Sequence, residues 1–160
     1  MPQAVSWDEL YKFEDYVESA AQAILSIDGV RTYIQRNEDD IATPSVGVQF
    51  SVGPALEHYG LRALDGQPFL DAWTGRLTFA IATKRSKNNS HHSGIRASIR
   101  RRMQKIALWT TALMPYHQIT QIIEAGTSPN LVDEKLRDIS EISFSVFLNI
   151  REDAWPDATP

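Results

Sequence analysis

The sequence has 160 residues, of which 42% are hydrophobic and 22% charged, the ordinary composition of a single globular domain. It contains no cysteine, which excludes structural disulfides and thiolate metal sites, and its longest apolar runs are too short to span a bilayer. The net charge is only −4, yet residues 72–123 carry nine Lys or Arg and no Asp or Glu. The amino terminus has neither a basic region nor an apolar core, so no signal peptide is expected.

The first expected element is an amphipathic helix that begins near Ser6 or Asp8, whose side chains can accept from the first free amides. Its apolar residues recur at alternating steps of three and four: Leu10, Phe13, Val17, Ala20 and Ile24. Gly29 is expected to close it after Asp28, because glycine readily takes the left-handed conformation beyond a helix end. A strand over residues 30–35, an acidic turn over 37–40 and an alternating, half-buried strand over 46–52 follow.

Residues 54–70 are expected to form a loop or an arm, because Pro54, Gly60, Gly66 and Pro68 interrupt any regular period. The next expected strand, over residues 73–83, is the longest. Its apolar face carries Trp73, Leu77, Phe79 and Ile81.

A second helix is expected to begin near His92 and to end at Pro115. Its apolar stripe consists of Ile95, Ile99, Met103, Ile106 and Leu113. Strands over residues 116–123 and 141–150 are expected to finish the domain, with a loop over 126–138 between them.

This element order predicts one α+β domain over residues 1–152, with two helices packed on one face of a largely antiparallel sheet. Residues 153–160 are expected to be a flexible tail. The predicted core consists of Leu10, Phe13, Val17, Ile24, Phe50, Leu77, Phe79, Ile99, Met103, Ile106, Phe144, Val146 and Leu148.

No motif predicts catalysis, a metal or a cofactor, and we expect a protein that is not an enzyme. The adjacent His91 and His92 are interpreted as exposed loop residues, because neighbouring side chains on an extended segment point apart and no third ligand is near. His58 and His117 have no acid or serine motif beside them. Asp39 and Asp40 fit a solvated turn better than a pair of catalytic carboxylates.

The basic window has three possible interpretations. Its main cluster consists of Lys84, Arg85 and Lys87 at a strand end and Arg96, Arg100, Arg101, Arg102 and Lys105 on the following helix. They could form a solvated helix face, an electrostatic interface with another protein, or a phosphate-binding surface. No Phe, Tyr or Trp lies between residues 84 and 105, so the aromatic platforms typical of single-strand binding are missing.

The pattern resembles the tail-terminator, or tail-completion, proteins of long-tailed bacteriophages. The resemblance rests on the opening helix, the strand over residues 46–52, the long strand over 73–83 that runs into a helix near His92, and the closing strand over 142–150, which Arg137 and Asp138 introduce. It implies a structural virion protein of the tail or neck that is assembled in the host cytoplasm. Such a subunit forms a ring, expected to be a homohexamer, that caps the tail tube and takes part in head–tail joining.

The resemblance also implies partners: other copies in the ring, the tail-tube protein, the head-side connector or neck protein, and DNA that crosses the channel without sequence-specific binding. No membrane partner is expected. We predict that the basic face (Lys84, Arg85, Arg96, Arg100, Arg101 and Arg102) meets an acidic face on the next copy (Glu38, Asp39, Asp40, Glu134 and Asp138). An apolar arm should add Leu56, Tyr59, Leu61, Leu64 and Phe69 to the interface. The alternative is a nucleic-acid-binding module that uses residues 84–105.

Overall fold

The computed structural model describes residues 13–35, 42–51, 69–85, 90–105, 107–109 and 117–151. The main helices in these ranges are α2 (Phe13–Ile24) and α3 (Ser90–Met103). The strands are β1 (Arg31–Ile34), β2 (Ser45–Ser51), β3 (Phe69–Lys84), β4 (His117–Thr127), β5 (Leu131–Val132) and β6 (Arg137–Arg151). They form one six-stranded sheet in the order β1-β2-β3-β6-β4, and β5 pairs with β6 beside this path.

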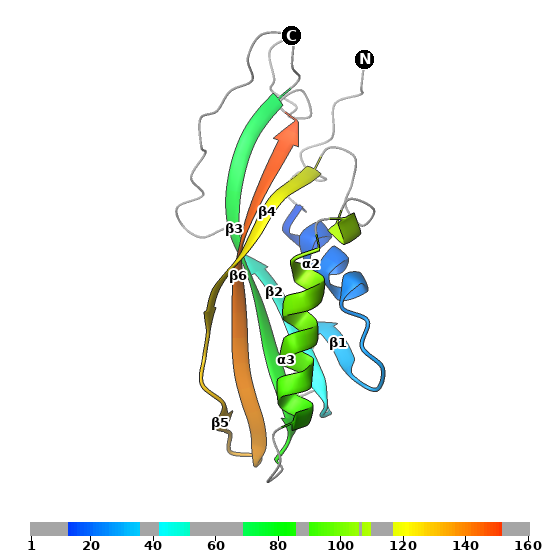
Figure 1. Cartoon of the computed structure of the whole chain (residues 1–160), viewed down its shortest axis with the longest axis vertical. Coiled ribbons are helices and arrows are strands. Elements are labelled where there is room, and N and C mark those ends of the chain that lie inside the picture. Colours follow the sequence, from blue (N-terminus) through cyan, green and yellow to red (C-terminus); the bar gives the residue numbers. More distant parts are fainter. Residues whose placement is uncertain are drawn as a thin grey trace.

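The sheet is mixed but mostly antiparallel, and α2 and α3 pack on one of its faces (Figure 1). The β1–β2 pair is parallel, while the β2–β3, β3–β6, β4–β6 and β5–β6 pairs are antiparallel. The predicted α+β fold, with two helices on one face of a largely antiparallel sheet, is therefore confirmed. No helix in the described ranges combines the length and apolarity that a membrane span requires.

Strands β3 and β6 form the spine of the sheet. They have 16 and 15 residues and pair from Phe69 opposite Arg151 to Lys84 opposite Arg137. Both are interior strands. Apolar side chains alternate along them because successive residues point to opposite faces and the helices cover only one face. Because β3 begins at Phe69, the last two residues of the segment expected as an arm belong to a strand instead.

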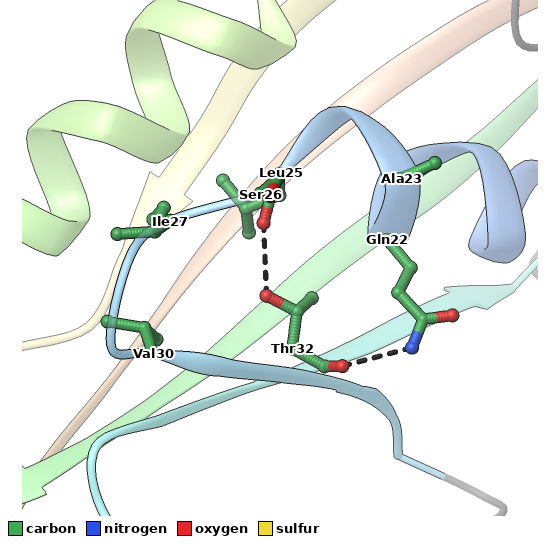
Figure 2. Close-up of a pocket in the computed structure, with 7 residues that line it drawn as sticks. All are labelled: Gln22, Ala23, Leu25, Ser26, Ile27, Val30 and Thr32. Atoms are coloured by element: carbon green, nitrogen blue, oxygen red, sulfur yellow. Dashed lines mark hydrogen bonds between the residues drawn. The ribbon is translucent and has the colours of Figure 1, made fainter.

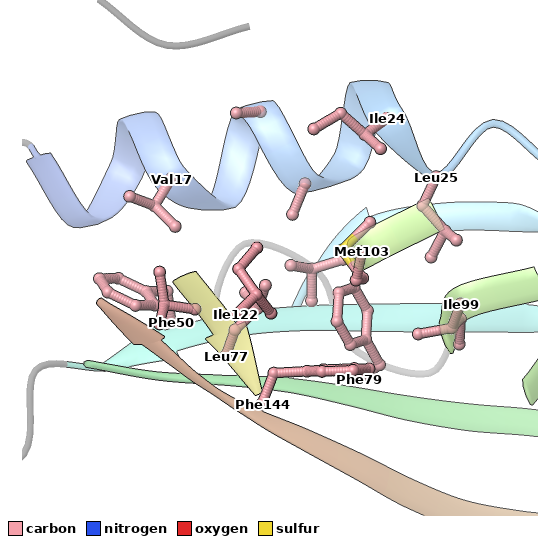
Figure 3. Close-up of a cluster of buried hydrophobic side chains, with 14 of the residues drawn as sticks. Val17, Ile24, Leu25, Phe50, Leu77, Phe79, Ile99, Met103, Ile122 and Phe144 are labelled. Atoms are coloured by element: carbon pink, nitrogen blue, oxygen red, sulfur yellow. The ribbon is translucent and has the colours of Figure 1, made fainter. Parts of the chain in front are cut away.

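The core lies between the helices and the helix-facing side of the sheet (Figure 3). Nine of the predicted core residues are buried there and confirm the prediction: Val17, Ile24, Phe50, Leu77, Phe79, Ile99, Met103, Phe144 and Val146. The rings of Phe79 and Phe144, which lie on adjacent strands, meet edge to face with centroids 5.9 Å apart. Leu10 and Ile106, and the side chains of Phe13 and Leu148, fall outside what the structure describes.

Gly75 interrupts the apolar face of β3 for a steric reason. A Cβ atom at this position would lie 2.2 Å from Cζ of Phe50, so the ring of Phe50 occupies the space that a side chain would need. The pairing of Phe50 with Leu77 on the same face places the ring over this gap. The glycine therefore allows a large aromatic side chain to lie directly against the central strand.

Both helices end earlier than the sequence predicts. Helix α2 ends at Ile24, and Gly29, with a φ of 74°, forms the turn before β1 rather than closing the helix. The chain leaves the helix because Thr32 Oγ1 donates to the carbonyl of Leu25 at 3.0 Å and ties this connection to β1. Helix α3 ends at Met103 rather than at Pro115. At this end of the helix, the buried indole of Trp109 donates to the Met103 carbonyl at 3.0 Å.

The segment over residues 126–138, expected to be a loop, is largely a hairpin. Strand β4 continues to Thr127, β5 occupies Leu131–Val132, and β6 begins at Arg137. The physical reason is pairing: Leu131 lies opposite Ile139 and Val132 opposite Asp138, so β6 provides a partner that sequence alone does not reveal. The acidic turn over 37–40, most of the predicted arm and the tail over 153–160 lie outside the described residues.

Candidate functional site

The structure divides the six residues of the predicted basic face into two groups. Lys84 and Arg85, at the end of β3, and Arg101, on α3, are exposed. Arg96, Arg100 and Arg102 are half-buried on the same helix. Only the first group is fully available for contact with another molecule.

Arg100 is held by an acid of β4. Its Nε lies 3.1 and 3.0 Å from the two carboxylate oxygens of Glu124, and its Nη2 donates to Glu124 Oε1 at 2.9 Å and to Thr127 Oγ1 at 3.0 Å. Hydrogen bonds from Arg100, and then from Thr127, lower the pKa of Glu124 below its usual value of 4.5. This bidentate pair ties α3 to the edge strand β4.

Arg102 and Arg96 also face inward. Arg102 Nη1 donates to the carbonyl of Ile24 at 3.1 Å, so it satisfies a free acceptor at the end of α2. Nε and Nη2 of Arg96 are buried with no hydrogen-bond partner among the described residues. The Arg96 charge instead acts at a distance and lowers the pKa values of His92 and Glu124.

Reversing the charge of two adjacent arginines should therefore have different effects. We expect Arg100→Glu to lower the melting temperature by about 2–4 °C, because it removes an ion pair worth about 1 kcal/mol and places a second carboxylate beside Glu124. Arg101→Glu, on the exposed side of the same turn, should leave the melting temperature unchanged. Thermal denaturation at pH 7 followed by circular dichroism measures both, and equal losses would contradict the assigned roles.

His92 corrects the interpretation of the two histidines. Both histidines lie within α3, not in a loop. His91 is exposed, as expected, whereas His92 is only 1% exposed. Its Nδ1 lies 2.8 Å from Thr83 Oγ1 of β3 and its Nε2 lies 2.6 Å from Ser140 Oγ of β6. Sequence reasoning missed this role, although the spacing of His92, Ile95, Ile99 and Met103 places the histidine on the buried stripe of the helix.

The His92 cluster has the atoms of a serine–histidine pair but not the setting of a catalytic one. Ser140 is 4% exposed and Thr83 is 2% exposed, so the three side chains are shielded from solvent. The cluster joins the start of α3 to the ends of both spine strands, with buried Asp138 and half-buried Arg96 as the nearest charges. Its chemistry is that of a buried, hydrogen-bonded structural link.

This burial predicts a pH dependence of stability near neutrality. Burial, then Arg96 and His91, lower the pKa of His92 below its usual 6.5, while Asp138 opposes them. The unfolded chain binds the proton more readily, so the free energy of unfolding should fall as the pH drops through 6.5 and level off below the folded pKa. Urea unfolding between pH 7.5 and 5 measures this loss, and a variant with Leu at position 92 should lack it. Equal slopes in the two proteins would contradict the prediction.

The predicted acidic face and arm are only partly visible. Glu134 is exposed in the β5–β6 turn, whereas Asp138 is 8% exposed and is largely removed from any outer surface. Glu38, Asp39 and Asp40 fall outside the described residues, as do Leu56, Tyr59, Leu61 and Leu64. Phe69 starts β3, and its side chain is not described.

A pocket of about 240 Å³ lies between the end of α2 and β1 (Figure 2). Its wall consists of Gln22, Ala23, Leu25, Ser26, Ile27, Val30 and Thr32. Gln22 Nε2 donates to the Thr32 carbonyl at 2.9 Å, so the polar groups of the wall are partly used to fix the pocket's shape. It is lined by a mixture of aliphatic and small polar groups and by no charged side chain.

The described residues contain no cluster of three or more His, Asp or Glu side chains placed to hold a metal ion. The chain matches no protein-family model, and a search of curated proteins gives no similar sequence. Among the described residues, the exposed part of the basic face and the α2–β1 pocket are candidate contact sites.

Proposed function

We propose that this chain is a structural ring subunit similar to the tail terminators of long-tailed phages. The observation that carries the proposal is the β3–β6 spine, in which a long strand leads into α3 and pairs over its whole length with the closing strand. These are the elements on which the resemblance rests, and they occur in the expected order behind an amphipathic helix and β2. This element order supports the proposal.

In this proposal the subunit acts by assembly. A homohexameric ring would cap the tail tube, meet the head-side connector or neck protein and leave a channel for DNA in the virion. Each copy in such a ring contacts its neighbours through two different surfaces, because cyclic rings use heterologous contacts. A chain whose basic residues are concentrated in one window offers the asymmetry that such contacts need.

The structure narrows the basic residues available for this contact to Lys84, Arg85 and Arg101. Arg100 and Arg102 already bond within the molecule, so their reversal would test folding as much as assembly. The test variant therefore combines Lys84→Glu, Arg85→Glu and Arg101→Glu, and it should weaken assembly without changing the melting temperature. The matched control variant is Arg100→Glu, which should lower the melting temperature.

Light scattering coupled to size-exclusion chromatography tests the proposal. The purified protein, alone or with tail tubes, should give particles near six times the 18.0 kDa monomer mass, with ring-shaped projections in negative-stain images. Rings in the wild type that are lost in the triple variant would support the proposal. A monomer that ignores tail tubes but is retained on heparin in a salt-dependent manner would overturn it in favour of the nucleic-acid-binding alternative.

A further inference from the structure

The first turn of α3 buries one side chain against the spine. Among residues 90–93 only His92 is buried, and its ring lies within hydrogen-bond distance of Thr83 on β3 and Ser140 on β6. The helix begins beside the lower ends of these two strands (Figure 1). We refer to residues 90–93 as the latch.

Gly94 separates the latch from the rest of the helix. A Cβ atom at this position would meet no atom within 4 Å, and its φ lies outside the left-handed region, so neither space nor backbone conformation requires a glycine. Glycine within a helix lowers the stability of the helical state about fivefold relative to alanine. Ile95, Ile99 and Met103 hold the rest of α3, because all three are buried in the core. The helix can therefore open more easily at the latch than beyond it.

The hydrogen bonds of His92 suit a neutral imidazole. A neutral ring has one N–H donor and one acceptor nitrogen, and the hydroxyls of Thr83 and Ser140 can each take the complementary role. A protonated ring has two donors, so both hydroxyls must accept from it, and the one that donated to the ring needs a new acceptor. Both hydroxyl residues are buried, so bulk water cannot supply that acceptor while the latch is closed. Proton binding therefore disturbs the closed cluster.

The surroundings on the helix side also oppose a proton on His92. Burial has the largest effect and lowers its pKa, and the Arg96 guanidinium, one turn further along α3, lowers it next. His91 adds a smaller repulsion. The first turn contains no acidic residue, so the positive end of the helix macrodipole is not compensated there.

The strands supply one opposing charge. Asp138 on β6 raises the pKa of the imidazole, but the net shift is downward. On β3 the facing group is the neutral hydroxyl of Thr83. Lys84 and Arg137 pair one residue further along, and their side chains lie on the other face of the sheet because strand side chains alternate. Within the described part of the chain, the closed latch therefore favours the neutral ring.

We propose that an acidic pH releases the latch from the spine. Protonation of His92 detaches it from Thr83 and Ser140, and Gly94 acts as the hinge. The helix from Ile95 onward stays packed on the sheet. The driving force is solvation, since water stabilises the imidazolium once the latch is open. This local opening is distinct from global unfolding, and it does not depend on ring assembly.

Amide hydrogen exchange measured by NMR in low concentrations of urea tests the proposal. In α-helical geometry the amides of Gly94, Ile95 and Arg96 bond to carbonyls of the latch, so they lose protection when it opens. Between pH 7.5 and 5 their protection factors, corrected for the pH dependence of intrinsic exchange, should fall at least about tenfold. The fall should be independent of urea, because a local opening exposes little surface. The amides of Phe79 and Phe144, in the core strands, should keep the full urea dependence of global unfolding.

Two variants show whether the proton on His92 controls the opening. His92→Gln keeps a neutral hydrogen-bonding side chain that does not titrate, so the protection of the three amides should no longer change with pH. Arg96→Met removes a repelling charge but keeps the aliphatic stem, and Nε and Nη2 of Arg96 have no hydrogen-bond partner among the described residues. In this variant the fall in protection should level off at a higher pH, a change that a purely structural role of Arg96 would not produce.

A third variant tests the hinge. Gly94→Ala should raise the protection of the latch-bonded amides about fivefold at both pH values and leave their pH dependence intact. Gly126→Ala on β4 is the matched control, because a Cβ atom there also meets nothing within 4 Å, and it should leave this protection unchanged. The proposal is overturned if the three amides lose protection only with the full urea dependence of global unfolding, or if their pH dependence persists in His92→Gln.

Discussion

Phe79→Ala is expected to lower the free energy of unfolding by about 3–5 kcal/mol, the range measured for deletion of a buried phenyl ring. Phe79 is fully buried on the central strand β3, and its ring meets that of Phe144 at an interplanar angle of 82°. Its removal would leave a cavity between the spine and both helices, where the tightly packed core cannot collapse without moving β3 or β6. A loss of this size is a large fraction of the total stability of a domain.

Urea denaturation followed by tryptophan fluorescence measures this loss as a shift in the midpoint at constant slope. Ile123→Ala is the matched control, because Ile123 is 45% exposed on β4 and its truncation should change the stability by less than about 1 kcal/mol. A Phe79→Ala variant as stable as this control would mean that the helix-facing side of the sheet is assigned to the wrong residues.

The His92 cluster gives the second large effect. His92→Leu retains most of the side-chain volume but removes the groups that bond Thr83 and Ser140. Each hydroxyl is then buried without its imidazole partner, at a cost of about 1–3 kcal/mol apiece, and we expect a total loss of about 2–6 kcal/mol. Equilibrium unfolding at pH 7.5, where the imidazole is neutral, measures this loss without a contribution from protonation.

A triple variant distinguishes hydrogen bonding from simple packing. Thr83→Val/His92→Leu/Ser140→Ala replaces all three polar groups by apolar ones, so it should recover most of the stability that His92→Leu loses. If the three substitutions instead add their separate losses, the side chains contribute only through shape and the hydrogen-bonded link is unimportant.

Local periodicity was enough to predict most of the fold. The spacing of Val17 and Ile24, and the alternation of Leu77, Phe79, Phe144 and Val146, predict buried faces that the structure confirms. These patterns are readable because a helix or strand repeats its orientation every few residues, so each element reports its own buried side. The helix ends were less predictable, since Trp109 and Thr32 set them through contacts made outside the helices.

The partners of polar side chains depended on elements distant in sequence. Arg100 and Arg101 are adjacent and chemically identical, yet Glu124, 24 residues further on, binds one and leaves the other exposed. His92 contacts Thr83 and Ser140 because β3 and β6 pair beneath α3. The pairing of β5 with β6 turned a predicted loop into a hairpin that exposes Leu136. The order of residues thus fixed which faces are apolar, since that property is local. The packing of distant elements fixed which charged side chains are exposed and where the α2–β1 pocket lies, since those depend on three-dimensional proximity.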